Sequence, residues 1–151
     1  MKKSIYLFGA LFLSLLLIGS GCTKYSFMKM EDKVIGTWTF EKATLRPGTF
    51  KPPMDVTKNF KNLEFTFNSD GTSIVYNNHT KETKNGYWKM YAIEEYDEEN
   101  SSYQYILKFQ YNLPDRKKET YVWDIENITA KRFRAHETIG NDNYNYVLLR
   151  K

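Results

Sequence analysis

Apolar and polar residues alternate with a period of two along most of the chain after residue 33. The first run places Val34, Gly36, Trp38 and Phe40 on one face and polar residues on the other. This alternation is typical of a β-strand with one buried face. Runs of the same kind, separated by turn sequences, predict eight strands, at 34–42, 62–68, 72–78, 86–93, 102–111, 118–126, 130–138 and 143–150.

The predicted strands follow one another closely, and no amphipathic helix of useful length lies between them. Short connections favour antiparallel pairing of consecutive strands. Eight such strands form either a sandwich or a closed up-and-down barrel. A closed barrel removes the exposed sheet edges and leaves an interior wide enough for side chains or for one small ligand. The fold class is therefore predicted to be all-β.

One connection, residues 44–60, is long and contains Pro47, Gly48, Pro52 and Pro53 together with apolar residues of its own. Long loops of this kind are commonly functional. Two interpretations stay open: a lid over one end of the fold, or a plug that fills that end.

The first residues differ from all the others. Lys2 and Lys3 precede an apolar run over residues 5–18, and Gly19–Ser20–Gly21 leads directly into Cys22. This order is typical of an export signal with a cleavage site after small residues. The apolar run is shorter than the roughly 20 residues that a membrane-spanning helix needs.

Small residues in front of a single cysteine resemble a bacterial lipoprotein lipobox, although Gly19 stands where leucine is usual. The resemblance implies cleavage before Cys22, acylation of that cysteine with chains such as palmitate, and anchoring in the cell envelope. Thr23 after the cysteine favours the outer membrane, on its periplasmic or surface face. An ordinary secretory signal with an incidental cysteine is the alternative. The expected organisation is a signal peptide at 1–21, a tether at 22–32 and a barrel at 33–151.

Charge and composition narrow the function. The whole chain carries 22 Lys+Arg against 18 Asp+Glu, a net charge of +4. Loss of residues 1–21 would leave 130 residues with a net charge of +2, because Lys2 and Lys3 leave with the signal. So small a charge does not indicate a nucleic-acid partner. One cysteine and two histidines exclude an intramolecular disulfide and make a structural zinc site implausible.

Four short motifs carry a second resemblance: Gly36–Thr37–Trp38, Phe67–Asn68–Ser69–Asp70–Gly71, Gly86–Tyr87–Trp88 and Leu148–Leu149–Arg150. In this order they resemble the lipocalin-like domains of Bacteroidota lipoproteins, over about residues 33–151. The resemblance implies an eight-stranded antiparallel up-and-down β-barrel. In lipocalins an arginine packs over the tryptophan of the Gly-x-Trp motif. We therefore predict that Arg150 stacks on Trp38, beside Gly36, at a closed end of the barrel.

Aromatic residues give the best indication of function. Seven of them share the predicted inward face and form the candidate ligand-binding wall: Trp88, Tyr103, Tyr105, Tyr121, Trp123, Tyr144 and Tyr146. Buried tyrosines need hydrogen-bond partners, and such a wall suits a small hydrophobic or amphiphilic ligand. The alternative is a packed core whose hydroxyls bond one another or water.

Two functions follow from these alternatives. The first is a membrane-anchored lipoprotein that binds a small hydrophobic or amphiphilic ligand in its barrel. The second is an accessory lipoprotein of a cell-envelope complex, with a filled barrel and a protein partner on outer-face residues such as Tyr87, Tyr91 and Tyr96.

Catalytic and metal chemistry find little support. His79 and His136 lie near strand ends and are predicted to be exposed and solitary, and no nucleophile or phosphate-loop motif is present. The acidic run 94–99 lacks the spacing of a calcium loop and is expected to be a solvated hairpin tip. Cross-strand pairing with acidic residues on the preceding strand is expected for the basic set 131–134. We therefore predict no enzyme activity, no cofactor and no metal site.

Overall fold

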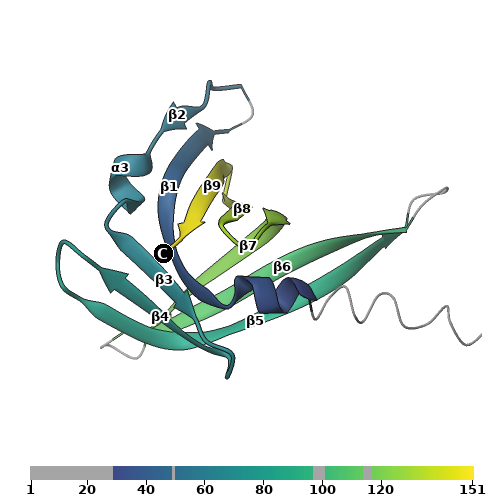
Figure 1. Cartoon of the computed structure of the whole chain (residues 1–151). Coiled ribbons are helices and arrows are strands. Elements are labelled where there is room, and N and C mark those ends of the chain that lie inside the picture. Colours follow the sequence, from purple (N-terminus) through teal and green to yellow (C-terminus); the bar gives the residue numbers. More distant parts are fainter. Residues whose placement is uncertain (1–28, 49, 97–100, 114–116) are drawn as a thin grey trace, which may run out of the picture. The chain divides into compact units, whose positions relative to one another are not determined.

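A computed structural model of the chain describes residues 29–48, 50–96, 101–113 and 117–151 (Figure 1). Residues 29–34 are helical and lead into the first strand. The elements that follow are β1 (Gly36–Pro47), β2 (Met54–Asp55), α3 (Thr57–Phe60), β3 (Leu63–Phe67), β4 (Thr72–Asn77), β5 (Thr83–Tyr96), β6 (Ser101–Asn112), β7 (Lys118–Ile128), β8 (Arg132–Ile139) and β9 (Asp142–Arg150).

The eight long strands, β1 and β3 to β9, form a closed up-and-down barrel. From β3 onward each strand pairs antiparallel with the next, β1 pairs with β3, and β1 also pairs with β9 from Trp38↔Arg150 to Pro47↔Asp142. The two-residue β2 pairs with the far part of β1. This closure confirms the barrel and excludes the sandwich. We call the end that holds the start of β1 the closed end, and the opposite end the open end.

All eight predicted strands are present, with changed ends. β1 runs five residues past the prediction, to Pro47, because its far half pairs with β9. β5 and β6 are also longer than predicted, since they pair without interruption from Gly86↔Tyr111 to Tyr96↔Ser101.

Two β-bulges let strands extend without turning apolar residues outward. The register of β1 with β9 shifts between Phe40 and Lys42, so that Glu41 and Lys42 both face solvent and Ala43 is buried again. β7 shifts in the same way after Ile125. An extra residue at a bulge restores the inward parity of the positions that follow it, which explains why simple alternation ends near residue 41.

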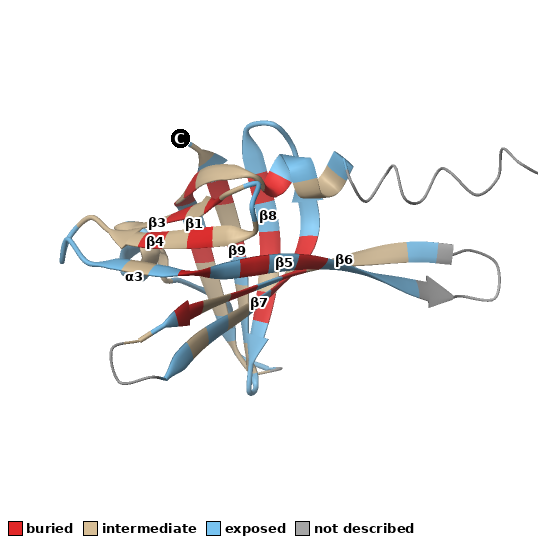
Figure 2. Ribbon diagram, turned by 90° about the horizontal axis from the view of Figure 1, so that it is seen from below, coloured by how far each residue is buried: buried red, intermediate tan, exposed pale blue. Residues whose placement is uncertain are grey.

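Aromatic rings fill the core of the barrel, and Figure 2 shows the buried residues along its strands in red. Phe109 and Trp123 pack edge to face with centroids 4.7 Å apart, and Phe65 lies 5.3 Å from Trp123. Phe40 contacts Trp123, Phe65 and Tyr146 from β1. Edge-to-face pairs of this kind add to the stabilisation from buried apolar area. The middle of the barrel is therefore packed.

At the closed end Arg150 holds three segments together, and its predicted stacking on Trp38 is confirmed. The guanidinium lies 4.5 Å from the centre of the Trp38 ring. It donates hydrogen bonds to the carbonyls of Lys33, Ile35 and Ala130 at 2.7, 2.6 and 2.7 Å. A Cβ on Gly36, whose φ is +135°, would lie 2.3 Å from the Arg150 Nη1 atom. Glycine at this position therefore lets the guanidinium reach the carbonyls.

The long connection 44–60 begins as strand and ends against the barrel. The Thr57 hydroxyl accepts from the N–H of Ala43 at 3.0 Å and donates to its carbonyl at 3.3 Å. The Phe60 ring lies 5.1 Å from Phe40 and 5.5 Å from Tyr146. Residues 54–60 thus cover part of the open end, which both the lid and the plug alternatives predict.

Residues 1–28, which include the predicted signal and Cys22, lie outside the described residues, as does the side chain of Tyr96. From Glu31 onward the described residues form one compact unit. Within the described part of the chain, no helix is both long and apolar enough to span a bilayer.

Candidate functional site

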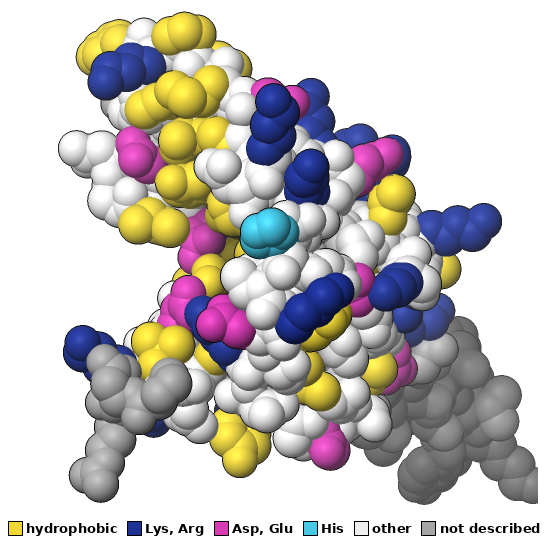
Figure 3. Space-filling model, turned by 90° about the vertical axis from the view of Figure 1, so that its left-hand side faces the viewer, with side chains coloured by type: hydrophobic (Ala, Val, Ile, Leu, Met, Phe, Trp, Pro, Cys, Tyr) yellow, Lys and Arg dark blue, Asp and Glu magenta, His cyan; other side chains and the backbone are white. Residues whose placement is uncertain are grey.

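The open end of the barrel is hollowed. Figure 3 shows this face, where hydrophobic side chains on one side of the hollow lie across from acidic and basic side chains. A cavity of about 160 Å³ lies between β3, β4, β5, β6 and β7, and is lined by Leu63, Val75, Asn77, Glu82, Lys84, Tyr111, Glu119 and Tyr121. We call the space that these eight residues line the mouth cavity.

An ion pair stands at the mouth cavity. The Lys84 Nζ atom lies 2.6 Å from the Glu119 carboxylate, and the Tyr121 hydroxyl donates to the other carboxylate oxygen. Burial opposes the ionisation of Glu119, but the hydrogen bonds from Lys84 and Tyr121 outweigh it and lower the pKa of Glu119. The cavity therefore presents a fixed positive and a fixed negative group beside the apolar side chains of Leu63 and Val75.

A second carboxylate lies inside the barrel. Glu137 on β8 is 6% exposed and accepts hydrogen bonds from the Tyr146 hydroxyl at 3.1 Å and from the N–H of Val122 at 3.3 Å. Burial raises the pKa of Glu137, and these two donors offset part of that effect. Burial and the negative charge of Glu137 likewise raise the pKa of Tyr146.

Three buried polar atoms have few possible partners. The hydroxyls of Ser73 and Tyr111 have no partner among the described residues other than each other, and the indole N–H of Trp123 has none other than Glu137. Burial raises the pKa of Tyr111, so its hydroxyl keeps its proton at neutral pH. Unpaired buried polar groups are rare in native proteins. Tyr111 lines the mouth cavity, so a polar group or a water molecule in the cavity lies beside this buried side chain.

The seven predicted ligand-binding residues do not form one wall. Tyr121, Tyr144 and Tyr146 lie toward the open end, where the Phe60 ring is 6.3 Å from Tyr144, and Trp123 lies in the packed middle. Trp88 lies toward the closed end and donates to the Asn68 carbonyl at 2.9 Å.

The other two predicted residues, Tyr103 and Tyr105, are half-buried and lie on the part of β6 that pairs with Ala92–Glu94 of β5. The Tyr103 hydroxyl donates to Glu94 at 3.0 Å. Because β5 runs from the open end to the closed end, this pairing is on the side away from the mouth cavity.

Three polar residues of the site were missed from the sequence: Lys84, Glu119 and Glu137. Glu137 shares the inward parity of Phe133 and Ala135, and Glu119 shares that of Tyr121, so parity is the signal for these two residues. Lys84 lies before the predicted strand 86–93, because β5 begins earlier, at Thr83. Charged side chains are expected to face outward because ionised groups are rarely buried unless paired.

The outer face carries the remaining polar groups. His136 is not solitary: its Nε2 atom lies 3.0 Å from the carboxylate of Asp124 on β7, and Glu126 lies 3.7 Å from its Nδ1 atom. His79 is exposed, as predicted. Among the described residues, no three His, Cys, Asp or Glu side chains are grouped to hold a metal ion.

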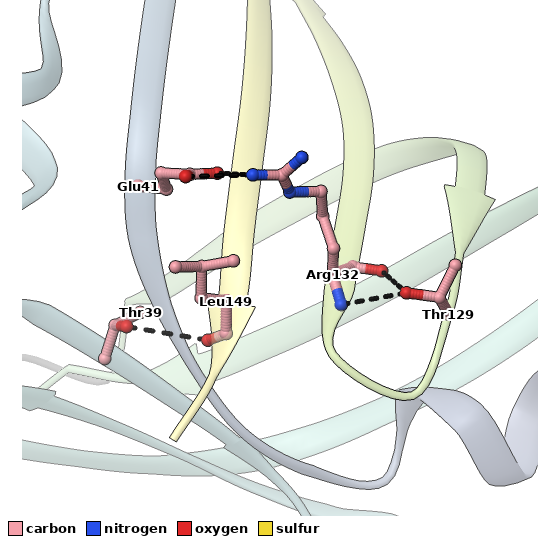
Figure 4. A network of polar contacts seen from close by, with 5 residues as sticks. All are labelled: Thr39, Glu41, Thr129, Arg132 and Leu149. Atoms are coloured by element: carbon pink, nitrogen blue, oxygen red, sulfur yellow. Dashed lines mark hydrogen bonds and ion pairs between the residues drawn. The ribbon is translucent and has the colours of Figure 1, made fainter.

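The expected pairing of the basic set 131–134 with β7 is wrong for Arg132. This arginine reaches across β9 to Glu41 on β1, with its Nη2 atom 2.9 and 2.7 Å from the two carboxylate oxygens (Figure 4). Glu41 is exposed on the outer face of β1, and β1 and β8 lie on either side of β9, which brings the two side chains within reach.

Comparisons with known proteins give a limited result. No family model matches the chain, and no curated protein matches it. A solved structure described as a lipocalin-like protein from Bacteroides uniformis is similar, with a TM-score of 0.48, 10% identity, and coverage of 79% of this chain and 99% of the other. An uncharacterized protein from Bacteroides eggerthii is similar with a TM-score of 0.45, 15% identity, and coverage of 78% and 98%.

Proposed function

We propose that the open end of the barrel binds a small amphiphilic molecule. The observation that carries the proposal is the mouth cavity, in which the apolar side chains of Leu63 and Val75 lie beside the Lys84–Glu119 ion pair. Apolar walls with a few placed polar groups are typical of small-molecule sites. The cavity, at about 160 Å³, is smaller than the roughly 300–1,000 Å³ of such sites. The ligand is therefore small, or only one end of the ligand enters the cavity.

The packed core limits how far a ligand can enter the barrel. The rings of Phe109, Trp123 and Phe65 fill the barrel below the cavity, so an acyl chain has no path to the closed end. The polar head of the ligand lies at Lys84 and Glu119, and its apolar part lies against Leu63 and Val75. No chemical step is proposed for this site.

Two measurements test this proposal. Native mass spectrometry of the protein purified from its own membrane shows whether a small molecule co-purifies. Titration with hexanoate and with hexylamine, short probes that suit so small a cavity, then compares the wild type with Lys84→Met and Glu119→Gln. Loss of one charge-assisted hydrogen bond is worth about 1.5–3 kcal/mol, so we expect affinity for one of the two probes to fall by about tenfold or more.

Lys108→Met is the matched control, because Lys108 is an exposed lysine on β6 outside the cavity. It should leave both affinities unchanged. Absence of any co-purifying molecule, together with equal binding by wild type and both mouth variants, contradicts the proposal.

We also propose that Cys22 is acylated and anchors the protein in the cell envelope, at the outer membrane. Support comes from the sequence alone: the charged start, the apolar run and the small residues before Cys22. Growth of the producing bacterium with an alkyne-tagged fatty acid should label the wild type and leave Cys22→Ala unlabelled. Equal labelling of both chains contradicts anchoring through this residue.

A protein partner is the second candidate function. The outer face of β5 exposes Tyr87 by 68%, Tyr91 by 42% and Ile93 by 45%. Exposed aromatic residues in a row are enriched at protein interfaces. Mild crosslinking in intact cells should capture an envelope protein with the wild type and lose it with Tyr87→Ser; recovery of the uncrosslinked chain alone argues against such a partner.

A further inference from the structure

The barrel is closed, yet one of its strands keeps an open edge. β4 pairs with β5 only from Tyr76↔Thr83 to Thr72↔Tyr87. The last backbone contact on this side is the hydrogen bond from the N–H of Trp88 to the carbonyl of Gly71, at 2.9 Å. Beyond it, residues 89–96 of β5 pair with β6 on one side, and no described residue pairs with their other side.

This edge lies away from the rest of the fold. Figures 1 and 2 show that the paired ends of β5 and β6 project beyond the other strands. Eight residues of extended strand span about 27 Å. An unpaired strand edge presents a row of backbone N–H and C=O groups and is a template for another strand. Natural proteins usually shorten or cover such edges, so one of this length needs a reason.

We propose that this edge pairs with the same edge of a second copy of the chain. The two strands run antiparallel, and the twofold axis passes between the two Ala92 residues. A twofold axis normal to the sheet keeps equivalent side chains of the two copies on the same face. Two residues can therefore lie opposite each other only when their numbers are both even or both odd. Centred on Ala92, the pairing sets Tyr91 of one copy opposite Ile93 of the other.

The side chains favour this register. Tyr91 and Ile93 are 42% and 45% exposed in the single chain. Aromatic and β-branched residues directly opposite one another stabilise a sheet. The pairing places Tyr91 of each copy against Ile93 of the other, once on each side of the axis, and so reduces the exposure of both side chains.

Neighbouring registers are less favourable. An axis at Tyr91 sets Glu95 opposite Tyr87, where β4 already occupies the edge. An axis at Ile93 sets Glu95 opposite Tyr91, so that Tyr91 and Ile93 no longer meet. Of these three registers, only the one centred on Ala92 sets Tyr91 opposite Ile93.

Disulfide trapping tests the register directly. In the full-length chain in its own membrane, Ala92→Cys places two thiols opposite each other. Directly opposite residues of antiparallel strands have Cα atoms about 4.5–5.5 Å apart, within the range that a disulfide spans. We expect mild oxidation to convert Ala92→Cys into a covalent dimer. Tyr91→Cys alone should form none, and co-expression of Tyr91→Cys with Ile93→Cys chains should restore it.

Val122→Cys is the matched control, since Val122 is 44% exposed on β7, away from this edge. The wild type gives the background from Cys22. Maleimide labelling under denaturing and native conditions shows that each variant is folded and its thiol accessible. The proposal is overturned if accessible Ala92→Cys thiols stay monomeric, if Val122→Cys dimerises equally, or if Ala92→Cys is trapped on a different protein. It does not rest on ligand binding at the open end.

Discussion

The contacts at the closed end converge on the side chain of Arg150. Replacement of Arg150 by alanine tests how much this side chain contributes to the stability of the fold. The guanidinium of Arg150 bonds the carbonyls of Lys33, Ile35 and Ala130 and lies over the Trp38 ring. It thereby ties the segment before β1 and the turn before β8 to the last strand. In Arg150→Ala these contacts are lost together, while the backbone pairing of β9 with β1 is kept.

The structure gives the size of the loss. The bond to Ile35 is partly buried and the bonds to Lys33 and Ala130 are exposed. Hydrogen bonds to charged groups contribute about 1.5–3 kcal/mol, and exposed ones less because water replaces them. Stacking on the tryptophan adds about 0.5–2 kcal/mol. We therefore expect Arg150→Ala to lower the free energy of unfolding by about 3–5 kcal/mol.

Urea unfolding followed by tryptophan fluorescence measures this difference, with an unchanged m-value as the sign of an unaltered unfolded state. Arg150→Lys should fall between the alanine variant and the wild type, because an ammonium cannot reach three carbonyls at once. Arg134→Ala, an exposed arginine on β8, should change stability by no more than about 0.5 kcal/mol. A loss below about 1 kcal/mol in Arg150→Ala, or one equal to that of the control, refutes this account of the closed end.

Three further predictions concern the barrel and its open end. Burial raises the pKa of Glu137, so the folded state holds this proton more tightly than the unfolded state does. Its stabilising effect is present at low pH and is lost as the pH rises through the folded pKa. Glu137→Gln should therefore gain stability relative to the wild type as the pH rises above about 4 in urea unfolding, and a difference that does not change with pH argues against this. Gly86→Ala places a Cβ 1.8 Å from the Gln110 carbonyl oxygen, which should cost about 3 kcal/mol or prevent folding, and wild-type stability by thermal melting contradicts that clash. Thr57→Val removes both hydrogen bonds to Ala43, so hydrogen exchange in residues 50–60 should speed up while global stability falls by about 1–2 kcal/mol; unchanged local exchange shows that the segment is held by other contacts.

The sequence alone determined the strands and the closed end. Period-two alternation is a local property, because each strand must turn one face to the core. All eight strands follow from it. The contact between Arg150 and Trp38 also followed, because closure makes the first and last strands neighbours and the motifs place both residues at that junction.

Only the tertiary structure decided which end each aromatic residue occupies and which polar groups meet. Tyr103 and Tyr121 share inward parity, but strand direction and register send them to opposite ends. The ion pair of Lys84 and Glu119 joins β5 and β7 across a sequence separation of 35 residues. Whether a residue occupies an odd or an even position determines which face of the strand its side chain takes. Its position along the barrel axis depends on how the strands are paired, which alternation does not show. The open edge of β5 also depends on register. It exists because the pairing with β4 reaches only Tyr87, nine residues before β5 ends at Tyr96.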